Sequence, residues 1–251
     1  NDKIYTDLDA ENNIIYGANT AIKSDGVGIT DIKADQNNNI GFLTNDKGEI
    51  TDIAQNGINV TEGTVKVTAD GNNIIKASEY GSYASGNGSK VSLNAKENRI
   101  TVTGDANSEM TTGIYAGANG QQEVLSDTTT IDVSFVAGRV IGIHGDNNGS
   151  VYVDTDSLTI NSSFAGTGSG SDTHGILAGN IGNTNTTANV DVDAINDINI
   201  KVQSQAVYDS YQESIAAVKA NKGTNIDVKS EQGDVNFTVL SDAASRGISA
   251  E

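Results

Sequence analysis

The sequence predicts an all-β protein built as a parallel β-helix, a solenoid with three short strands per coil and about eight coils. Three observations lead to this fold class: a two-residue alternation of apolar and polar residues, a four-residue motif that recurs about every 32 residues, and turns rich in Gly and Asn. Together they predict one repetitive unit over residues 1–251 rather than two packed domains.

Short apolar runs alternate with polar residues along the chain, as at 65–67, 91–93 and 151–153. A period of two places alternate side chains on opposite faces of a strand. Hydrophobic residues make up only 36% of the chain and the net charge is −18, a balance that is also typical of disorder. The ordered alternation favours strands instead.

A four-residue motif recurs eight times: its first residue is small, its second is usually Ile, its third is any residue and its fourth is usually small. The first residues of successive motifs are 36, 24, 32, 29, 33, 42 and 30 positions apart. Three strands in about 32 residues fit a β-helix coil better than a four-stranded propeller blade. The residues at the second motif position should therefore stack as one buried column, and the small residues at the fourth position should stack as a parallel column. The buried column is Ile22, Ile58, Ile114, Ile143, Ile176, Val218 and Ile248, and the small column is Ala84, Ala116, Gly145, Ala178 and Ala220.

Asn residues lie at the expected corners, at 11–13, 37–39, 72–73 and Asn98. Asn tolerates the left-handed backbone conformation of a sharp bend, and stacked amides could hydrogen-bond as a ladder. The alternative is that Asn is simply frequent in loops. The absence of Pro agrees with strands whose N–H groups are all needed for pairing.

Composition excludes several classes of function. The chain has no Cys, so a disulfide, a thiolate metal site and a cysteine nucleophile are impossible. The net charge of −18 argues against nucleic acid and anionic membranes as partners. No run approaches the ~18–20 apolar residues of a membrane helix, so we expect no direct membrane insertion of this segment.

The stretch 91–102, with sequence VSLNAKENRITV, is followed by a polar loop and by TGIYAG at 112–117. This rhythm resembles the passenger domain of a bacterial autotransporter adhesin. The resemblance covers nearly the whole chain but includes no diagnostic motif. It implies a right-handed β-helix that is exported and displayed from the outer membrane on the bacterial cell surface. It also leads us to expect a segment excised from a longer passenger.

Catalytic signals are weak. His144 occupies the third motif position and should be a surface imidazole, and His174 precedes Gly175. Two carboxylate pairs, at 154 and 156 and at 191 and 193, could serve a glycosidase, but alternation with Val places them on the solvated outer face. We therefore predict no enzyme activity and no catalytic residues.

Ligand motifs are equally weak. The segment 145–149 superficially resembles a calcium loop, but its twelve-residue pattern is absent. The Gly-rich segment 166–170 lacks the Lys of a phosphate-binding loop. We predict no cofactor and no metal site, while weak cation binding to the acidic surface stays open.

The third motif position should point outward and form a second column, which reads Lys23, Asn59, Tyr83, Tyr115, His144, Leu177, Lys219 and Ser249. Its middle would be an aromatic and apolar stripe in a chain with 5% aromatic residues. Such rings can contact a sugar or an apolar side chain of a partner. The alternative is that the rings stack to stabilise the sheet, or lie beneath the insertion 203–214. The candidate interaction surface is Tyr83, Tyr115, His144 and Leu177 with Tyr208 and Tyr211 of that insertion.

The sequence thus predicts a cell-surface adhesin that mediates attachment to host, matrix or other bacteria through a protein, a glycan or a copy of itself. Extended loops are expected near 43–56, 161–173 and 203–214, where insertions on a solenoid often bind. Two alternatives remain open: a purely structural β-helical stalk and a β-helical carbohydrate-active enzyme.

Overall fold

The computed structural model describes residues 4–105, 108–166, 172–180, 186–205, 215–241 and 245–250. Every regular element in these ranges is a β-strand, so none is a helix that could span a membrane. The strands are β1 (Ile4–Ile15), β2 (Thr20–Ile40), β3 (Phe42–Thr44), β4 (Ile50–Ser85), β5 (Lys90–Thr103), β6 (Met110–Gly117), β7 (Gln121–Phe135), β8 (Arg139–Gly145), β9 (Ser150–Phe164), β10 (Thr173–Ala178), β11 (Asn189–Ala194), β12 (Ile198–Ser204), β13 (Ile215–Ala220), β14 (Asn225–Ser230), β15 (Val235–Ser241) and β16 (Ser245–Ala250).

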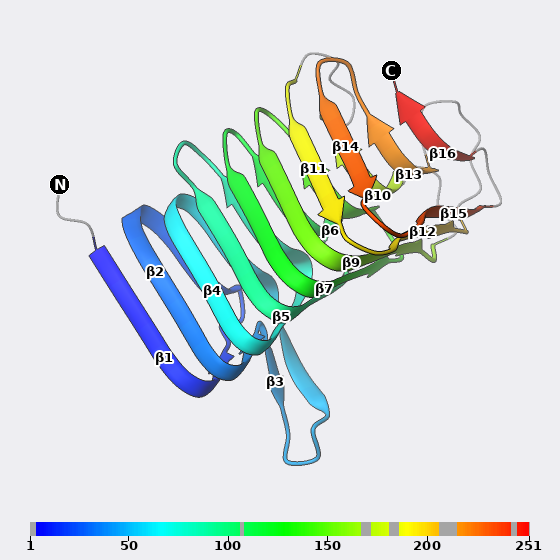
Figure 1. Cartoon of the computed structure of the whole chain (residues 1–251). Coiled ribbons are helices and arrows are strands. Elements are labelled where there is room, and N and C mark those ends of the chain that lie inside the picture. Colours follow the sequence, from blue (N-terminus) through cyan, green and yellow to red (C-terminus); the bar gives the residue numbers. More distant parts are fainter. Residues whose placement is uncertain are drawn as a thin grey trace.

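The strands form a parallel sheet that curls round an axis, so that successive windings of the chain lie side by side (Figure 1). The pairing between described strands is parallel except where β3 pairs with β4. The prediction of an all-β protein made of parallel, curling strands is therefore confirmed.

Strand pairing divides the curled sheet into three faces. The first face contains β11, β14 and the first parts of β5, β7 and β9. The second face contains β12, β15 and the second parts of those long strands. The third face contains β6, β8, β10, β13 and β16, and β2 and β4 pass through all three faces.

The core lies between the faces and is made of stacked aliphatic side chains. Val65 pairs with Val91 on the first face and Ile75 with Ile100 on the second, and all four side chains are fully buried. Polar residues between them point outward, as the alternating burial along β11 shows. The two-residue alternation in the sequence thus corresponds to inward and outward positions.

The predicted motif columns exist on the third face. Ile114 pairs with Ile143, Ile143 with Ile176, and Ile176 with Val218, and these residues are buried. Ser82 is the partner of Ile114 in the preceding winding. One member of the column was predicted wrongly: Ile248 has the expected register but is 66% exposed, because β16 pairs with β13 on one side and no other described strand lies on its second side.

Glycine opens the motif because the second face comes very close at that position. A Cβ added to Gly142 would overlap Cγ2 of Ile160 and lie 2.6 Å from the carbonyl oxygen of Gly175. The same two kinds of neighbour, an Ile methyl of the second face and the motif carbonyl of the next winding, surround four other motif glycines. These are Gly57, Gly81, Gly113 and Gly175.

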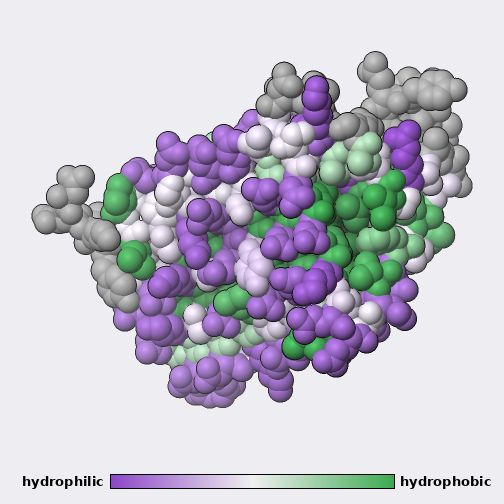
Figure 2. Space-filling model, turned by 45° about the horizontal axis from the view of Figure 1, so that its top comes forward, coloured by the Kyte–Doolittle hydropathy of each residue, from purple (hydrophilic) through white to green (hydrophobic). Residues whose placement is uncertain are grey.

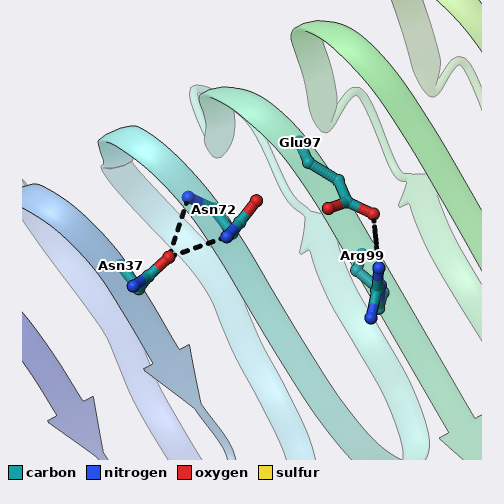
Figure 3. A network of polar contacts seen from close by, with 4 residues as sticks. All are labelled: Asn37, Asn72, Glu97 and Arg99. Carbon is teal, nitrogen blue, oxygen red and sulfur yellow. Dashed lines mark hydrogen bonds and ion pairs between the residues drawn. The ribbon is translucent and has the colours of Figure 1, made fainter.

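Asn side chains form two ladders at the corner between the first and second faces. The inner ladder joins Asn13, Asn38, Asn73 and Asn98, all buried. In the outer ladder, Asn37 accepts hydrogen bonds from the side chain (2.8 Å) and backbone N–H (3.2 Å) of Asn72 (Figure 3). In the winding after Asn72, Glu97 takes the equivalent position and accepts a hydrogen bond from Arg99 of the same strand. The ladder was predicted correctly, but its residues do not have the left-handed backbone suggested as one reason for Asn there.

A hairpin interrupts the regular windings where an extended loop was expected near 43–56. β3 pairs antiparallel with the start of β4, and the pair projects from the sheet (Figure 1). Asn45 closes its turn by accepting hydrogen bonds from the backbone N–H groups of Lys47 and Glu49. Of the two other expected loops, residues 161–164 belong to β9 and 203–204 to β12, whereas 167–171 and 206–214 lie outside the described residues.

The solvated surface is mostly polar, with hydrophobic residues gathered toward the C-terminal half in one view (Figure 2). The exposed large hydrophobic residues include Val235, Leu240 and Ile248 on the two last strands, β15 and β16. They are exposed because, among the described strands, β15 pairs only with β12 and β16 only with β13.

Replacing Ile143 by Ala should lower the free energy of unfolding by about 2–5 kcal/mol, since the change removes buried methyl groups and leaves a cavity. Ile248→Ala is the matched control in the same column and should have little effect, because Ile248 is exposed. Urea denaturation of both variants measures the difference. Equal losses for the two variants would contradict the register.

Gly142→Ala should destabilise the fold by about 1–3 kcal/mol, because the added methyl must displace Ile160 and the backbone of the next winding. Gly247→Ala is the control at the same motif position, where a Cβ meets nothing within 4 Å. Thermal melts compare the two variants. A Gly142→Ala protein as stable as the control would show that close approach does not select Gly.

Candidate functional site

The predicted stripe is a continuous column on the outer side of the third face. Tyr83 pairs with Tyr115, Tyr115 with His144, and His144 with Leu177. The pairing continues from Leu177 to Lys219 and from Lys219 to Ser249. The structure therefore brings together the four stripe residues of the candidate surface, whereas Tyr208 and Tyr211 lie outside the described residues.

Three tyrosines form the centre of this column. The rings of Tyr83 and Tyr115 are stacked, with centroids 4.9 Å apart and planes at 7°. Tyr80 packs edge-on against both, with centroids at 4.9 Å from Tyr83 and 5.7 Å from Tyr115. All three side chains are half-buried, so the cluster has one side in the protein and another in solvent.

Tyr80 was not among the predicted residues. It joins the cluster because Gly81 and Ser82 both face the core, which leaves Tyr80 and Tyr83 together on the outer side. Ser82 is fully buried and its hydroxyl donates to Gln122 at 2.8 Å. A strict two-residue alternation places Tyr80 on the inner side. The only sequence signal for the cluster is that Tyr80 and Tyr83 are both aromatic and lie three positions apart.

His144 is buried, contrary to the prediction of a surface imidazole. Its side chain is 3% exposed, and Nε2 lies 3.2 Å from the carbonyl oxygen of Gly179, to which it donates. Nδ1 is buried and has no hydrogen-bond partner among the described residues. Burial is the main cause that lowers the pKa of His144 to about 4, and the nearby His174 and Arg139 lower it further, while the Gly179 hydrogen bond opposes them.

Leu177 is also fully buried, so the stripe faces solvent only around its tyrosines. The outward register was predicted correctly for His144 and Leu177, but solvent exposure was wrong. Alternation within a strand specifies which side of the sheet a residue faces; it carries no information on what covers that side.

Asp146 follows the column and begins a tight turn. The N–H of Gly149 donates to the carbonyl of Asp146 at 2.7 Å, and Asn147 and Asn148 between them have φ of 46° and 64°. These features identify a type I′ turn, so the segment that superficially resembled a calcium loop is a two-residue connection. Burial raises the pKa of the Asp146 carboxyl, and no residue in the described ranges hydrogen-bonds its Oδ1.

The hydroxyls of Tyr80 and Tyr115 are resistant to ionisation. Burial raises the pKa of Tyr80 and Tyr115 well above the usual value, and the negative charge of Asp146 adds to the effect at Tyr115. Both phenols are therefore neutral hydrogen-bonding groups at any physiological pH. Tyr83 and Tyr115 cover one face of each other's ring, so that face of each ring is closed to a ligand.

The two histidines lie on neighbouring strands, β8 and β10, and both are buried. Asp172 lies 3.8 Å from Nε2 of His174 and 3.6 Å from Nε of Arg139. Within the described ranges, no three His, Asp or Glu side chains are placed to hold a metal ion. Asp172 thus lies close to both His174 and Arg139, a grouping that the sequence analysis did not predict.

The carboxylates at 154, 191 and 193 lie on the outer side of the first face, as predicted. Asp191 pairs with Tyr152 and Asp193 with Asp154, so the acids stack along the sheet. The pKa of Asp191 is raised by partial burial first and then by the charges of Asp193 and Asp227.

Comparison of the chain with protein-family models, with curated proteins and with solved structures found no match.

Acid should destabilise the fold through His144. Its pKa is about 4 in the folded chain and about 6.5 in the unfolded chain, so the unfolded state binds more protons between these values. Stability therefore falls as the pH falls from 7 to 4, by on the order of 2–3 kcal/mol from this residue.

His144→Gln retains an amide donor for the Gly179 carbonyl and cannot titrate. Urea unfolding at several pH values should give this variant a shallower loss of stability in acid than the native chain. Parallel pH profiles would contradict the assignment. The carboxyl of Asp146, whose pKa is raised, acts in the opposite direction in both proteins and cancels in the comparison.

Proposed function

We propose that the chain is a segment of a right-handed parallel β-helix, with three strands per coil and about eight coils, that acts as a cell-surface adhesin. The observation that carries the proposal is the half-exposed cluster of Tyr80, Tyr83 and Tyr115 on the outer side of the third face. A chain with only eight Tyr, four Phe and no Trp concentrates three rings at one place.

Surface clusters of Tyr are suited to recognition, since the ring packs against apolar atoms and the hydroxyl bonds polar groups. The ring edges and hydroxyls fit a glycan or a polypeptide backbone on host, matrix or other bacterial surfaces. The resemblance to autotransporter passengers supports extracellular display from the outer membrane. The uneven connections into the third face, including the hairpin of β3, agree with solenoids whose insertions lie on a binding side.

Two other functions are supported less well. A structural stalk would use the tyrosine stack only to stabilise the sheet, and stacked aromatic pairs do stabilise sheets without a ligand. A carbohydrate-active enzyme would draw on the carboxylates at 154, 191 and 193, but these stack along the outer side of the first face instead of facing one another across a substrate. The exposed part of the third face lies at the tyrosines instead.

The double variant Tyr83→Phe/Tyr115→Phe tests the proposal. It retains the stacked rings and removes the two hydroxyls, so we expect an unchanged melting temperature and adhesion to cells or matrix reduced at least several-fold. Tyr152→Phe is the matched control on the first face, where the Tyr152 hydroxyl donates a hydrogen bond to Asp154 at 3.4 Å. Unchanged adhesion by the folded double variant would leave the cluster a structural feature and favour the stalk.

A further inference from the structure

A carboxylate without a positively charged partner follows the outer column of the third face. Asp146 is 5% exposed, and its Oδ2 accepts a hydrogen bond from Nδ2 of Asn147 at 3.1 Å. Its Oδ1 is buried, and no residue in the described ranges donates to it. Among the same residues, no Lys, Arg or His forms an ion pair with Asp146. Because a buried charge is costly unless it is paired, Oδ1 is a strong acceptor for a donor from another molecule.

The hydroxyl of Tyr115 lies close to this carboxylate. A Cβ added to Gly117 would overlap that hydroxyl, so the Tyr115 ring extends over Gly117, where no side chain takes up space. The N–H of Asp146 donates to the carbonyl of Ala116 at 2.8 Å, which places Asp146 beside Gly117 in the next winding. Burial first, and then the charge of Asp146, raises the pKa of Tyr115, as expected for two neighbouring groups. The carboxylate therefore borders the tyrosine cluster.

A second acceptor borders the same tyrosine. The ring of His144 packs edge-on against Tyr115, with centroids 5.1 Å apart. His144 is neutral at physiological pH because burial lowers its pKa to about 4. Its Nε2 donates to the carbonyl of Gly179, so Nδ1 is the acceptor nitrogen, and it has no partner among the described residues. A group that fits beside Tyr115 must therefore donate hydrogen bonds, and the charge of Asp146 favours a cation.

The geometry also selects the kind of cation. Because Oδ2 of Asp146 is bound to Asn147, the two-oxygen contact typical of Arg is not available. A lysine ammonium is a compact charge that can bond a single oxygen. Its flexible four-carbon chain can pack along tyrosine rings and reach a buried oxygen. An amino sugar has no such chain, since its ammonium is attached directly to the ring.

We propose that the tyrosine cluster binds a lysine side chain of a partner polypeptide, with the ammonium on Oδ1 of Asp146 and the aliphatic chain against Tyr115. The inference rests on the proposed function, because it names the ligand chemistry of the same surface. Since Oδ1 is covered in the free chain, the ammonium gains access through rotamer changes of the surrounding side chains, which are common at interfaces. The net charge of −18 also speeds association with a cationic partner.

Titration of the full chain with Nα-acetyl-lysine methylamide, followed by NMR of the tyrosine rings, tests the inference. We expect saturable shifts of the Tyr115 signals. Asp146→Asn has nearly the same shape and should bind the probe about tenfold more weakly, the equivalent of one hydrogen bond to a charged group. Asp154→Asn is the matched control, because it removes the same charge from the outer side of the first face, and it should retain the native affinity.

The probe can be changed while the native chain is kept, so the test does not depend on how well a variant folds. The ε-acetylated probe has no charge and should give no saturable shift, and the arginine analogue should bind more weakly than the lysine probe. Absence of saturable shifts at Tyr115 with the lysine probe would overturn the inference. Equal affinities of the two variants, or of the lysine and ε-acetylated probes, would also overturn it.

Adhesion assays separate this inference from the proposed function. Adhesion that is lost in Tyr83→Phe/Tyr115→Phe but unchanged in Asp146→Asn would retain the adhesin and refute the lysine contact. Saturable, Asp146-dependent binding of the lysine probe would support the lysine site even where neither variant changes adhesion, and that result would refute the adhesive role alone.

Discussion

The close approach of the third face to the second face is the constraint on which the rest of the structure depends. At five of the motif glycines the backbone contacts an isoleucine methyl of the second face, which leaves no room for a side chain; these are Gly57, Gly81, Gly113, Gly142 and Gly175. The residue that follows also points inward, and both positions are then repeated by parallel pairing from winding to winding. This contact brings the third face against the second around the aliphatic core.

The same constraint determines the outer side of the third face. Since two consecutive residues turn inward, the outward residues lie three apart, and aromatic side chains at those places meet within one strand as well as between strands. The tyrosine cluster is therefore a product of the backbone geometry that closes the core. The corner between the first and second faces is stabilised in another way. Its buried Asn side chains form hydrogen bonds with the Asn side chains of adjacent windings, which offsets the cost of burying a polar amide.

Sequence patterns predicted the columns because parallel pairing repeats one local geometry, and a residue such as Ile143 has equivalents in every winding. They also predicted the Asn ladder, for which spacing and residue type are sufficient. Burial of His144 and Leu177 could not be predicted, because it depends on what lies over the outer side of the sheet. Tyr80 was missed because Gly81 and Ser82, two consecutive residues, both face the core and so break the two-residue period. The exposure of Ile248 was missed because a repeat motif does not show whether a neighbouring strand covers its residues.

Stacking of windings has a consequence for how the chain folds. The motifs follow one another at intervals of 24 to 42 residues, so hydrogen-bonded partners are separated by about that length wherever they lie in the chain. Each winding then closes a loop of similar size, and the loop-closure entropy does not grow as the stack lengthens. Folding can proceed by sequential addition of windings onto a completed one. Unfolding can start at strands such as β16, where Ile248 is exposed and little apolar surface is buried.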